Sequence, residues 1–294
     1  MSWRTVIIEG RCKLDYRMGY MVVRAAEVKR VYLDEMAVLV IENPAVSLTG
    51  VLIEALTAKK IRVIFCDAKR NPVAELAPHH GCHDSSARIK AQARWTEEAK
   101  GAVWQAIVRD KIGRQAALLR TLGKEREYGL LSGYIPQVTP HDATNREGHA
   151  AKVYFNALFG MDFTRGADCP TNAALNYGYS LLLSAVNREV CALGCLTQLG
   201  IFHDNQFNHF NLSCDLMEPF RVLVDQAVLR AAPEQFGREE KHLLWNLLNE
   251  PVRIHGARQT VLNALRLYVR SVIDALNEGS PERILFYEQI EGDR

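Results

Sequence analysis

The short segment at residues 78–84 constrains the fold most, because it separates two stretches with different hydrophobic patterns. Before it, apolar and β-branched residues occur in short runs, which are typical of β-strands. After it, apolar residues recur at helical spacing over long stretches. The segment itself combines proline, glycine and polar residues, which favour a connection. The sequence therefore predicts an α+β protein, with a small N-terminal β-strand domain followed by a larger all-helical domain.

The first 78 residues are predicted to form seven strands and one helix. The strands fall on apolar runs at residues 5–9, 14–16, 20–24, 31–33, 38–41, 62–66 and 73–76. Helical spacing between Ser47 and Lys60 predicts the helix, with Ser47 as its N-cap. We therefore expect a β domain over residues 1–78, a linker over residues 79–85 and a helical domain over residues 86–294.

Six amphipathic stretches predict the helices of the second domain. They lie at about residues 86–122, 145–159, 172–199, 215–231, 236–249 and 256–277. Gly178 interrupts the third stretch between two tyrosines, although glycine inside a helix costs about 1 kcal/mol relative to alanine. Two interpretations remain open. Either Gly178 packs closely against another helix, or Tyr177 and Tyr179 face a functional site or DNA.

The composition favours a cytoplasmic, nucleic-acid-binding protein. No apolar run is long enough for a membrane span, and the N-terminus lacks a signal-peptide pattern. The seven cysteines are scattered without a Cys-x-x-Cys pair, which favours reduced thiols. Residues 51–130 carry 15 Lys and Arg against 9 Asp and Glu, whereas residues 131–294 carry 14 against 19. This imbalance fits a polyanion-binding surface beside a carboxylate metal site, but an ordinary surface also produces it.

Three segments carry candidate metal ligands. Thr144-x-x-Glu147 matches a helix capping box, or else it places a carboxylate on a first helical turn, beside Gly148. Asp215 and Glu218 share one helix face if a helix begins near Asp215, although acidic residues also favour that end through the helix dipole. His203 lies in the preceding Asn-rich loop. Carboxylates with one imidazole suit Mg²⁺ or Mn²⁺. The histidine cluster at residues 79–83 is a rival zinc site, but no second ligand group of zinc-finger spacing follows.

Several segments together resemble the CRISPR-associated spacer-acquisition integrase and endonuclease, the universal adaptation Cas protein, in its type II branch. In the family's order they are Trp3-Arg4-Thr5-Val6, Val63-Ile64-Phe65-Cys66-Asp67, Gly81-Cys82-His83-Asp84-Ser85-Ser86, Asn145-Arg146-Glu147-Gly148-His149-Ala150-Ala151, Tyr177-Gly178-Tyr179 and Met217-Glu218-Pro219-Phe220-Arg221. The resemblance implies a β domain used for dimerisation and a helical catalytic domain.

The resemblance also implies a catalytic metal site. Glu147, His203 and Glu218 match the family's catalytic residues and would bind Mg²⁺ or Mn²⁺. Asp215 matches a second acidic position and is expected to assist as a fourth ligand. Many relatives have Asp where this chain has Glu218, so the longer side chain changes the reach of that ligand.

The implied reaction is a transesterification, in which the 3′-hydroxyl of an incoming DNA fragment attacks a phosphodiester at a CRISPR repeat. The implied partners are double-stranded DNA, a second copy of the chain, a small ferredoxin-like adaptation protein and the type II effector nuclease. The basic segment offers phosphate-binding candidates, so DNA affinity should fall steeply with salt. These candidates are Lys59, Lys60, Arg62, Arg70, Arg88 and Arg94. A noncatalytic DNA-binding scaffold and a general metal-dependent nucleic-acid phosphodiesterase are the alternatives.

Overall fold

The computed structural model describes residues 4–68, 70, 72–76 and 84–290. The chain divides into two compact units, and the boundary falls between Gly81 and Cys82. Most of the expected linker at residues 79–85 lies outside the described residues, as does the histidine cluster at residues 79–83. Within the described part of the linker, Ser85 already begins the first helix of the second unit.

In its described residues, the first unit contains two four-stranded sheets, one α-helix and the short 3-10 turn η1 (Leu33–Glu35). The first sheet has the order β1-β5-β7-β8, in which β1 (Arg4–Ile8), β5 (Met36–Ile41) and β7 (Arg62–Cys66) are parallel and β8 (Pro72–Leu76) is antiparallel. The second sheet has the order β4-β3-β2-β6, formed by Val28–Tyr32, Tyr20–Arg24, Lys13–Arg17 and Ser47–Leu48. The β-strand character of the N-terminal domain is thus confirmed.

A single apolar core joins the two sheets and helix α1 (Gly50–Ala58). Every residue of β5 is buried, which explains its unbroken apolar run. The predicted N-cap Ser47 is wrong, because this residue pairs with Lys13 in the short strand β6. Thr49 caps α1 instead, and its hydroxyl accepts the backbone N–H of Leu52 at 3.4 Å.

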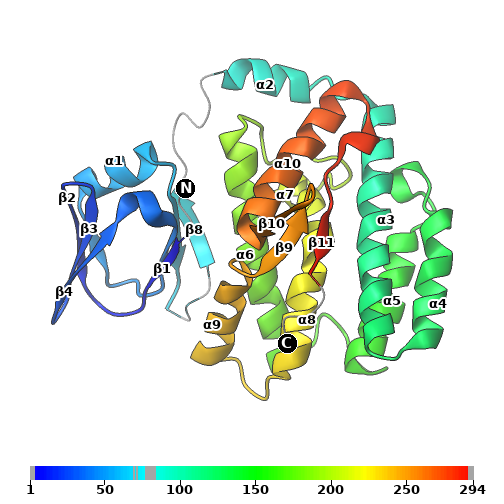
Figure 1. The fold of residues 1–294 in the computed structure, drawn as a ribbon, viewed down its shortest axis with the longest axis horizontal. Helices are drawn as coiled ribbons and strands as arrows, with labels where there is room; N and C mark the ends of the chain where they lie inside the picture. The colour runs from blue at the N-terminus through cyan, green and yellow to red at the C-terminus, as the bar shows by residue number, and fades with distance from the viewer. Residues whose placement is uncertain (1–3, 69, 71, 77–83, 291–294) are drawn as a thin grey trace. The chain divides into compact units, whose positions relative to one another are not determined.

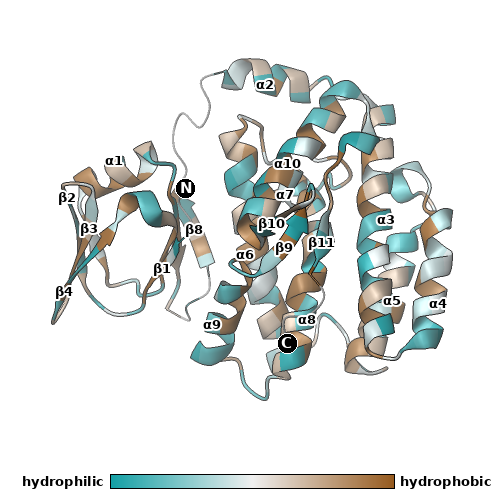
Figure 2. Ribbon diagram, in the orientation of Figure 1, coloured by the Kyte–Doolittle hydropathy of each residue, from teal (hydrophilic) through white to brown (hydrophobic). Residues whose placement is uncertain are grey.

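The second unit is mainly helical (Figure 1). Its helices are α2 (Ser85–Gln92), α3 (Glu97–Thr121), α4 (Glu125–Tyr134), α5 (Arg146–Phe159), α6 (Pro170–Ala192), α7 (Asn211–Met217), α8 (Arg221–Ala231), α9 (Arg238–Leu247) and α10 (Val261–Glu278). Helix α3 packs against α4, α5 and α10, and α6 packs against α7 to α10. Apolar and hydrophilic residues alternate along these helices (Figure 2), as expected for helices that each bury one face. None of the described helices is long and apolar enough to span a membrane.

The second unit also carries a three-stranded sheet of order β10-β9-β11, so the expectation of an all-helical domain is incomplete. Strands β9 (Pro251–Ile254) and β10 (Ala257–Thr260) form a hairpin, and β11 (Tyr287–Gln289) pairs with β9. His255 and Gly256 form its turn, with φ of 50° and 73°. The predicted helix at 256–277 was therefore placed too early, because this turn and β10 precede α10.

Gly178 illustrates how tightly the helices of this unit pack. A Cβ added at Gly178 would lie 2.4 Å from Cγ1 of Val224 on α8. The close-packing interpretation is therefore confirmed. Both flanking tyrosines are buried, and the Tyr177 hydroxyl accepts the indole N–H of Trp245 at 2.8 Å. The tyrosines thus serve the core rather than an exposed surface.

Candidate active site

Glu147 lies on the first turn of α5, but it does not cap the helix. Asn145 is the N-cap, with a φ of 50°, and its side chain accepts the N–H of Gly148 at 3.3 Å. Both oxygens of Asp142 accept further N–H groups there, including that of Glu147 at 2.9 Å. The Thr144 hydroxyl donates to a backbone carbonyl ahead of the helix. The capping-box interpretation is therefore wrong, and the carboxylate of Glu147 is available for another partner.

That partner is the ammonium group of Lys111 on α3, which Glu147 shares with Glu218. Lys111 Nζ lies 2.5 Å from Glu147 Oε1 and 2.5 Å from Glu218 Oε2. Glu218 sits in the short turn η4 (Glu218–Phe220) between α7 and α8, and its side chain is 3% exposed. Its other oxygen forms an ion pair with Arg221 Nη2 at 3.0 Å. Two carboxylates 71 positions apart therefore converge on one cation.

The charges around Glu218 keep it ionised despite its burial. Burial alone would raise the pKa of Glu218, but Arg221 and Lys111 together hold that pKa below its ordinary value of 4.5. Burial would likewise lower the pKa of Lys111, but Glu218 and Glu147 hold it above its ordinary value of 10.5. Glu218 and Lys111 are therefore both charged at neutral pH.

His203 is held by Asp215, which lies in the middle of α7 rather than at a helix start. Asp215 is fully buried, and it accepts backbone N–H groups from Ile201, Phe202 and His203 at 2.6–3.1 Å. Its Oδ1 also lies 2.5 Å from His203 Nδ1, and this hydrogen bond raises the pKa of His203 above 6.5. Because Nδ1 is committed to Asp215, Nε2 is the ring nitrogen that can bind a metal.

Trp104 forms the wall behind the His203 loop. This fully buried side chain on α3 stacks on Phe202, with ring centroids 4.6 Å apart and planes 5° apart. Its ring also meets the edge of His203 at 6.0 Å. Lys111 follows Trp104 by seven residues, two helical turns, so both side chains lie on the same side of α3.

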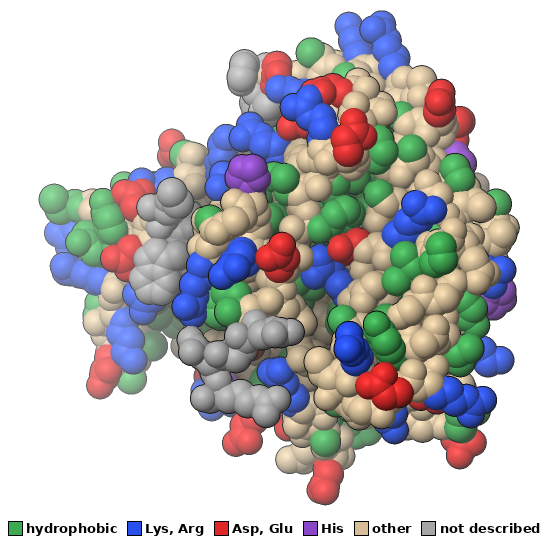
Figure 3. All heavy atoms as spheres, turned by 45° about the vertical axis from the view of Figure 1, so that its right-hand side comes forward, with side chains coloured by type: hydrophobic (Ala, Val, Ile, Leu, Met, Phe, Trp, Pro, Cys, Tyr) green, Lys and Arg blue, Asp and Glu red, His purple; other side chains and the backbone are tan. Residues whose placement is uncertain are grey.

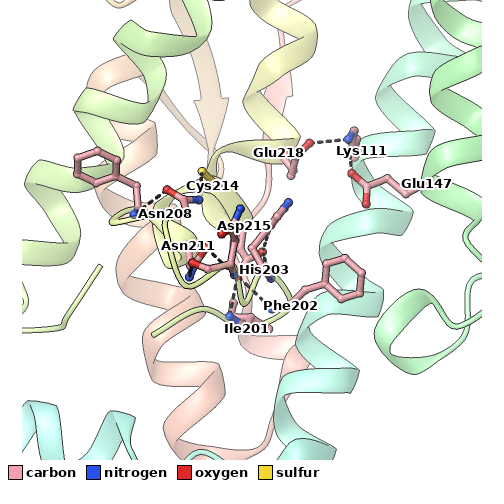
Figure 4. A network of polar contacts seen from close by, with 12 residues as sticks. Lys111, Glu147, Ile201, Phe202, His203, Asn208, Asn211, Cys214, Asp215 and Glu218 are labelled. Carbon is pink, nitrogen blue, oxygen red and sulfur yellow. Dashed lines mark hydrogen bonds and ion pairs between the residues drawn. The ribbon is translucent and has the colours of Figure 1, made fainter. Parts of the chain in front are cut away.

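The four predicted metal ligands thus form two pairs (Figure 4). Glu147 and Glu218 meet around Lys111, while His203 and Asp215 meet each other. The pairs are electrostatically coupled, because both glutamates contribute to the raised pKa of His203. Within the described residues, no three His, Cys, Asp or Glu side chains form a group arranged to hold a metal ion.

The donor set nevertheless fits a divalent cation. Two carboxylates already share a single cationic partner, the Lys111 ammonium, so their oxygens face one common point. Together with the imidazole of His203, whose pKa both glutamates raise, the donor types are oxygen and nitrogen without a thiolate, which suits Mg²⁺ or Mn²⁺. Glu147, Glu218 and His203 are therefore the side chains that could hold such an ion, whereas both oxygens of Asp215 are engaged by N–H groups.

Most of the predicted phosphate-binding residues already have acidic partners. The ion pairs are Lys59 with Asp34, Arg62 with Glu75, Arg70 with Glu42 and Arg88 with Asp84. The side chain of Arg62 is only 3% exposed, so a structural role in the β7–β8 pair explains it better than DNA contact. Lys60 and Arg94 are exposed. On the face drawn in Figure 3, basic and acidic side chains are interspersed.

Three residues of the site escaped prediction from the sequence. Arg221 stands three positions after Glu218, a spacing that places a cation beside a carboxylate. Trp104 and Lys111 belong to one buried stripe of α3. A lysine at a core position of such a stripe indicates a buried anionic partner, because lysine is almost never fully buried unless it is paired.

Comparison with known proteins identifies relatives across most of the chain. The model of the family described as CRISPR associated protein Cas1 matches residues 5–242. The CRISPR-associated endonuclease Cas1 of Neisseria meningitidis is 36% identical over 230 residues, which cover 78% of this chain and 76% of that protein.

Solved structures share the fold at low sequence identity. A chain of a Cas6-RT-Cas1–Cas2 complex has a TM-score of 0.75 and 16% identity, covering 98% of this chain and 36% of that one. A casposase bound to integration product has a TM-score of 0.74 and 19% identity, covering 95% of this chain and 91% of that one. At these identities the likeness concerns the fold, which extends over both units described above.

Proposed function

This chain belongs to the Cas1 family of CRISPR-associated proteins, and from that premise we propose that it is a metal-dependent DNA endonuclease and integrase. Family membership gives it a role in CRISPR spacer acquisition. Its proposed substrates are a short DNA duplex and the repeat of a CRISPR array, into which the duplex is inserted as a spacer. The motif at Met217–Arg221, together with the other matched segments, supports the type II branch.

The meeting of Glu147 and Glu218 around one cation is the observation that carries this proposal. Elements α5 and η4 bring the two carboxylates to Lys111 Nζ, each at 2.5 Å. Glu218 is buried and Glu147 partly buried, and such a pair of anions is unfavourable unless a cation neutralises it. In the active protein, Glu147 and Glu218 would bind Mg²⁺ or Mn²⁺ through their carboxylate oxygens. His203 would bind the same ion through Nε2.

Asp215 is proposed to position His203 rather than to bind the metal. Its oxygens accept three backbone N–H groups and the Nδ1–H of His203. Such a carboxylate fixes the tautomer and the orientation of a metal-binding histidine. It also keeps Nδ1 protonated, so Nε2 carries the free lone pair when the ring is neutral.

The proposed reaction conserves the number of phosphodiester bonds. The 3′-oxygen of the incoming strand attacks phosphorus at the repeat boundary, a new P–O bond forms, and the P–O bond to the neighbouring nucleotide breaks to leave a 3′-hydroxyl. Bound Mg²⁺ or Mn²⁺ supplies Lewis-acid stabilisation of the charge at phosphorus and lowers the pKa of the attacking hydroxyl. Water in place of the 3′-hydroxyl gives hydrolysis at the same site.

The proposed assembly pairs two copies of this chain through their β domains and joins such dimers through a small ferredoxin-like partner. The likeness to a chain of a Cas6-RT-Cas1–Cas2 complex supports a partner protein. The type II effector nuclease is a further proposed partner. Exposed Lys60 and Arg94 are the phosphate contacts that we favour among the predicted basic residues. We propose that the protein acts in the cytoplasm, where its cysteines stay reduced.

The test is a joining assay with a supercoiled plasmid that carries a CRISPR array, short duplex DNA and Mn²⁺. Glu147→Ala should abolish covalent joining and leave DNA binding unchanged, because the carboxylate serves the metal rather than the phosphate backbone. Glu98→Ala, which removes an exposed carboxylate on α3, is the matched control and should join DNA normally.

The products separate the proposal from its alternatives. Covalent joining by the unaltered protein supports an integrase, hydrolysis without joining a phosphodiesterase, and binding alone a noncatalytic scaffold. Full joining activity in the Glu147→Ala variant would remove Glu147 from the mechanism.

A further inference from the structure

Lys111 is a buried lysine of the second unit that pairs with two carboxylates. Its side chain is 8% exposed, although lysine is among the residues that are least often buried. It comes from α3, while its two partners come from α5 and η4. The ammonium group therefore joins three elements at the point where Glu147 and Glu218 meet (Figure 4).

The charges of this cluster already balance without a metal ion. Lys111 and Arg221 are cationic, and Glu147 and Glu218 are anionic, so the four formal charges cancel. A divalent cation added between the same carboxylates would give the cluster a net positive charge and would meet the ammonium at close range. Like charges in a buried site repel strongly, so both cations cannot occupy that place together.

We propose that Lys111 is a resident counter-ion, which holds Glu147 and Glu218 together in the metal-free protein and is displaced when the divalent cation binds. This inference rests on the proposed function, because it assumes that the two carboxylates are metal ligands. Lysine suits the role, since its compact ammonium sits on a flexible stem of four carbons and can swing away. Lys111 is therefore a positioning residue that stabilises the metal-free site and weakens its affinity for metal.

The experiment compares metal affinity and metal-free stability in the same full-length variants. Lys111→Met keeps most of the side-chain volume and removes the charge. Its dissociation constant for Mn²⁺, measured by calorimetry at pH 8, should fall by about tenfold or more, because no ammonium competes. Its melting temperature in EDTA should fall by at least about 5 °C, since the buried carboxylate of Glu218 and the partly buried carboxylate of Glu147 lose their shared cation. Saturating Mn²⁺ should raise the melting temperature of Lys111→Met by more than it raises that of the unaltered protein.

Two further variants keep the test clear. Lys111→Arg retains a positive charge, so it should not tighten Mn²⁺ binding. Lys100→Met, on the same helix, removes an ammonium that pairs with Glu97 at 2.9 Å at the surface, and it should match the unaltered protein in both measurements. If Lys111→Met is unfolded in EDTA, Lys111→Gln takes its place in the same titration, with the same expected tightening.

The outcomes distinguish this inference from the proposed function. Glu147→Gln should weaken Mn²⁺ binding if the carboxylates are metal ligands. Suppose that Glu147→Gln weakens Mn²⁺ binding, but that Lys111→Met or Lys111→Gln leaves it unchanged or weaker. This result would overturn the counter-ion role of Lys111 and still support the metal site. Equal Mn²⁺ affinity in Glu147→Gln and the unaltered protein would overturn both.

Discussion

Asp225 on α8 gives a quantitative prediction about the pH dependence of stability. Its carboxyl group is fully buried, and it accepts the hydroxyl groups of Tyr154, at 3.0 Å, and Tyr179. Burial raises the pKa of Asp225 from 3.8 to about 6, although the two hydroxyl groups and Arg221 oppose this effect. The folded protein therefore holds the Asp225 proton more tightly than the unfolded chain does.

The sign and size follow from proton linkage. Because the folded pKa is raised, the protonated carboxyl stabilises the fold at low pH, and this stability is lost as the pH rises from 3.8 through about 6. At about 1.4 kcal/mol for each tenfold difference in proton affinity, the full effect is about 3 kcal/mol. Of this, about 2 kcal/mol falls between about pH 4.5 and 7.5.

Asp225→Asn isolates this effect, because asparagine resembles the protonated carboxyl but does not titrate. Urea unfolding of both proteins should show the variant gaining about 2 kcal/mol relative to the unaltered protein between about pH 4.5 and 7.5. Groups that titrate in both proteins cancel in this difference. Fluorescence suits the assay, since Trp95, Trp104 and Trp245 are all buried in the helical unit. A stability difference that stays constant across this pH range would refute the reasoning.

Two further substitutions test the packing and positioning described above. Asp215→Asn places an NH₂ group among N–H donors, so it should lower the free energy of unfolding, measured by urea titration, by about 2–4 kcal/mol. The same variant should bind Mn²⁺ about tenfold more weakly in a calorimetric titration. Unchanged Mn²⁺ affinity would contradict the positioning role of Asp215. Gly178→Ala should destabilise the protein by about 1–3 kcal/mol, because the new Cβ would overlap Val224. Gly129→Ala on α4 should instead leave stability equal or slightly higher, because an added Cβ there would meet no other side chain within 4 Å. Similar effects of the two glycine variants would contradict this account.

The N-terminal strands were predictable because each one buries a short apolar run. The fully buried strand β5 is the clearest example. The β9–β10 hairpin was missed for a physical reason. Val252 and Ile254 alternate with exposed residues over only four positions, and the strongly periodic helix α10 begins immediately after the hairpin. The His255-Gly256 turn was the local signal that could have separated them.

The types of residue in the site were predictable, but their partners were not. The sequence indicated that Glu147 and Glu218 carry carboxylates near helix ends, which is where both lie. It could not indicate that Asn145 and Asp142 accept the N–H groups of the first turn of α5, so that the Glu147 carboxylate is not needed for capping. This arrangement depends on the backbone conformation around Asn145. Nor could spacing show that Asp215 lies behind His203, since four N–H groups from a folded loop define that arrangement.

Helix α3 explains how ligands from separate segments keep a common frame. Trp104 stacks on Phe202 and backs the loop that carries His203, while Lys111, two turns further along the same side, gathers Glu147 and Glu218. Helix α3 also packs against α4, α5 and α10, so its position is fixed by core contacts. In the metal-free protein, one helix therefore supports both the loop that carries His203 and the pair of glutamates. It follows that removal of metal should leave both halves of the site in place, and that changes in the buried face of α3 should disturb them together.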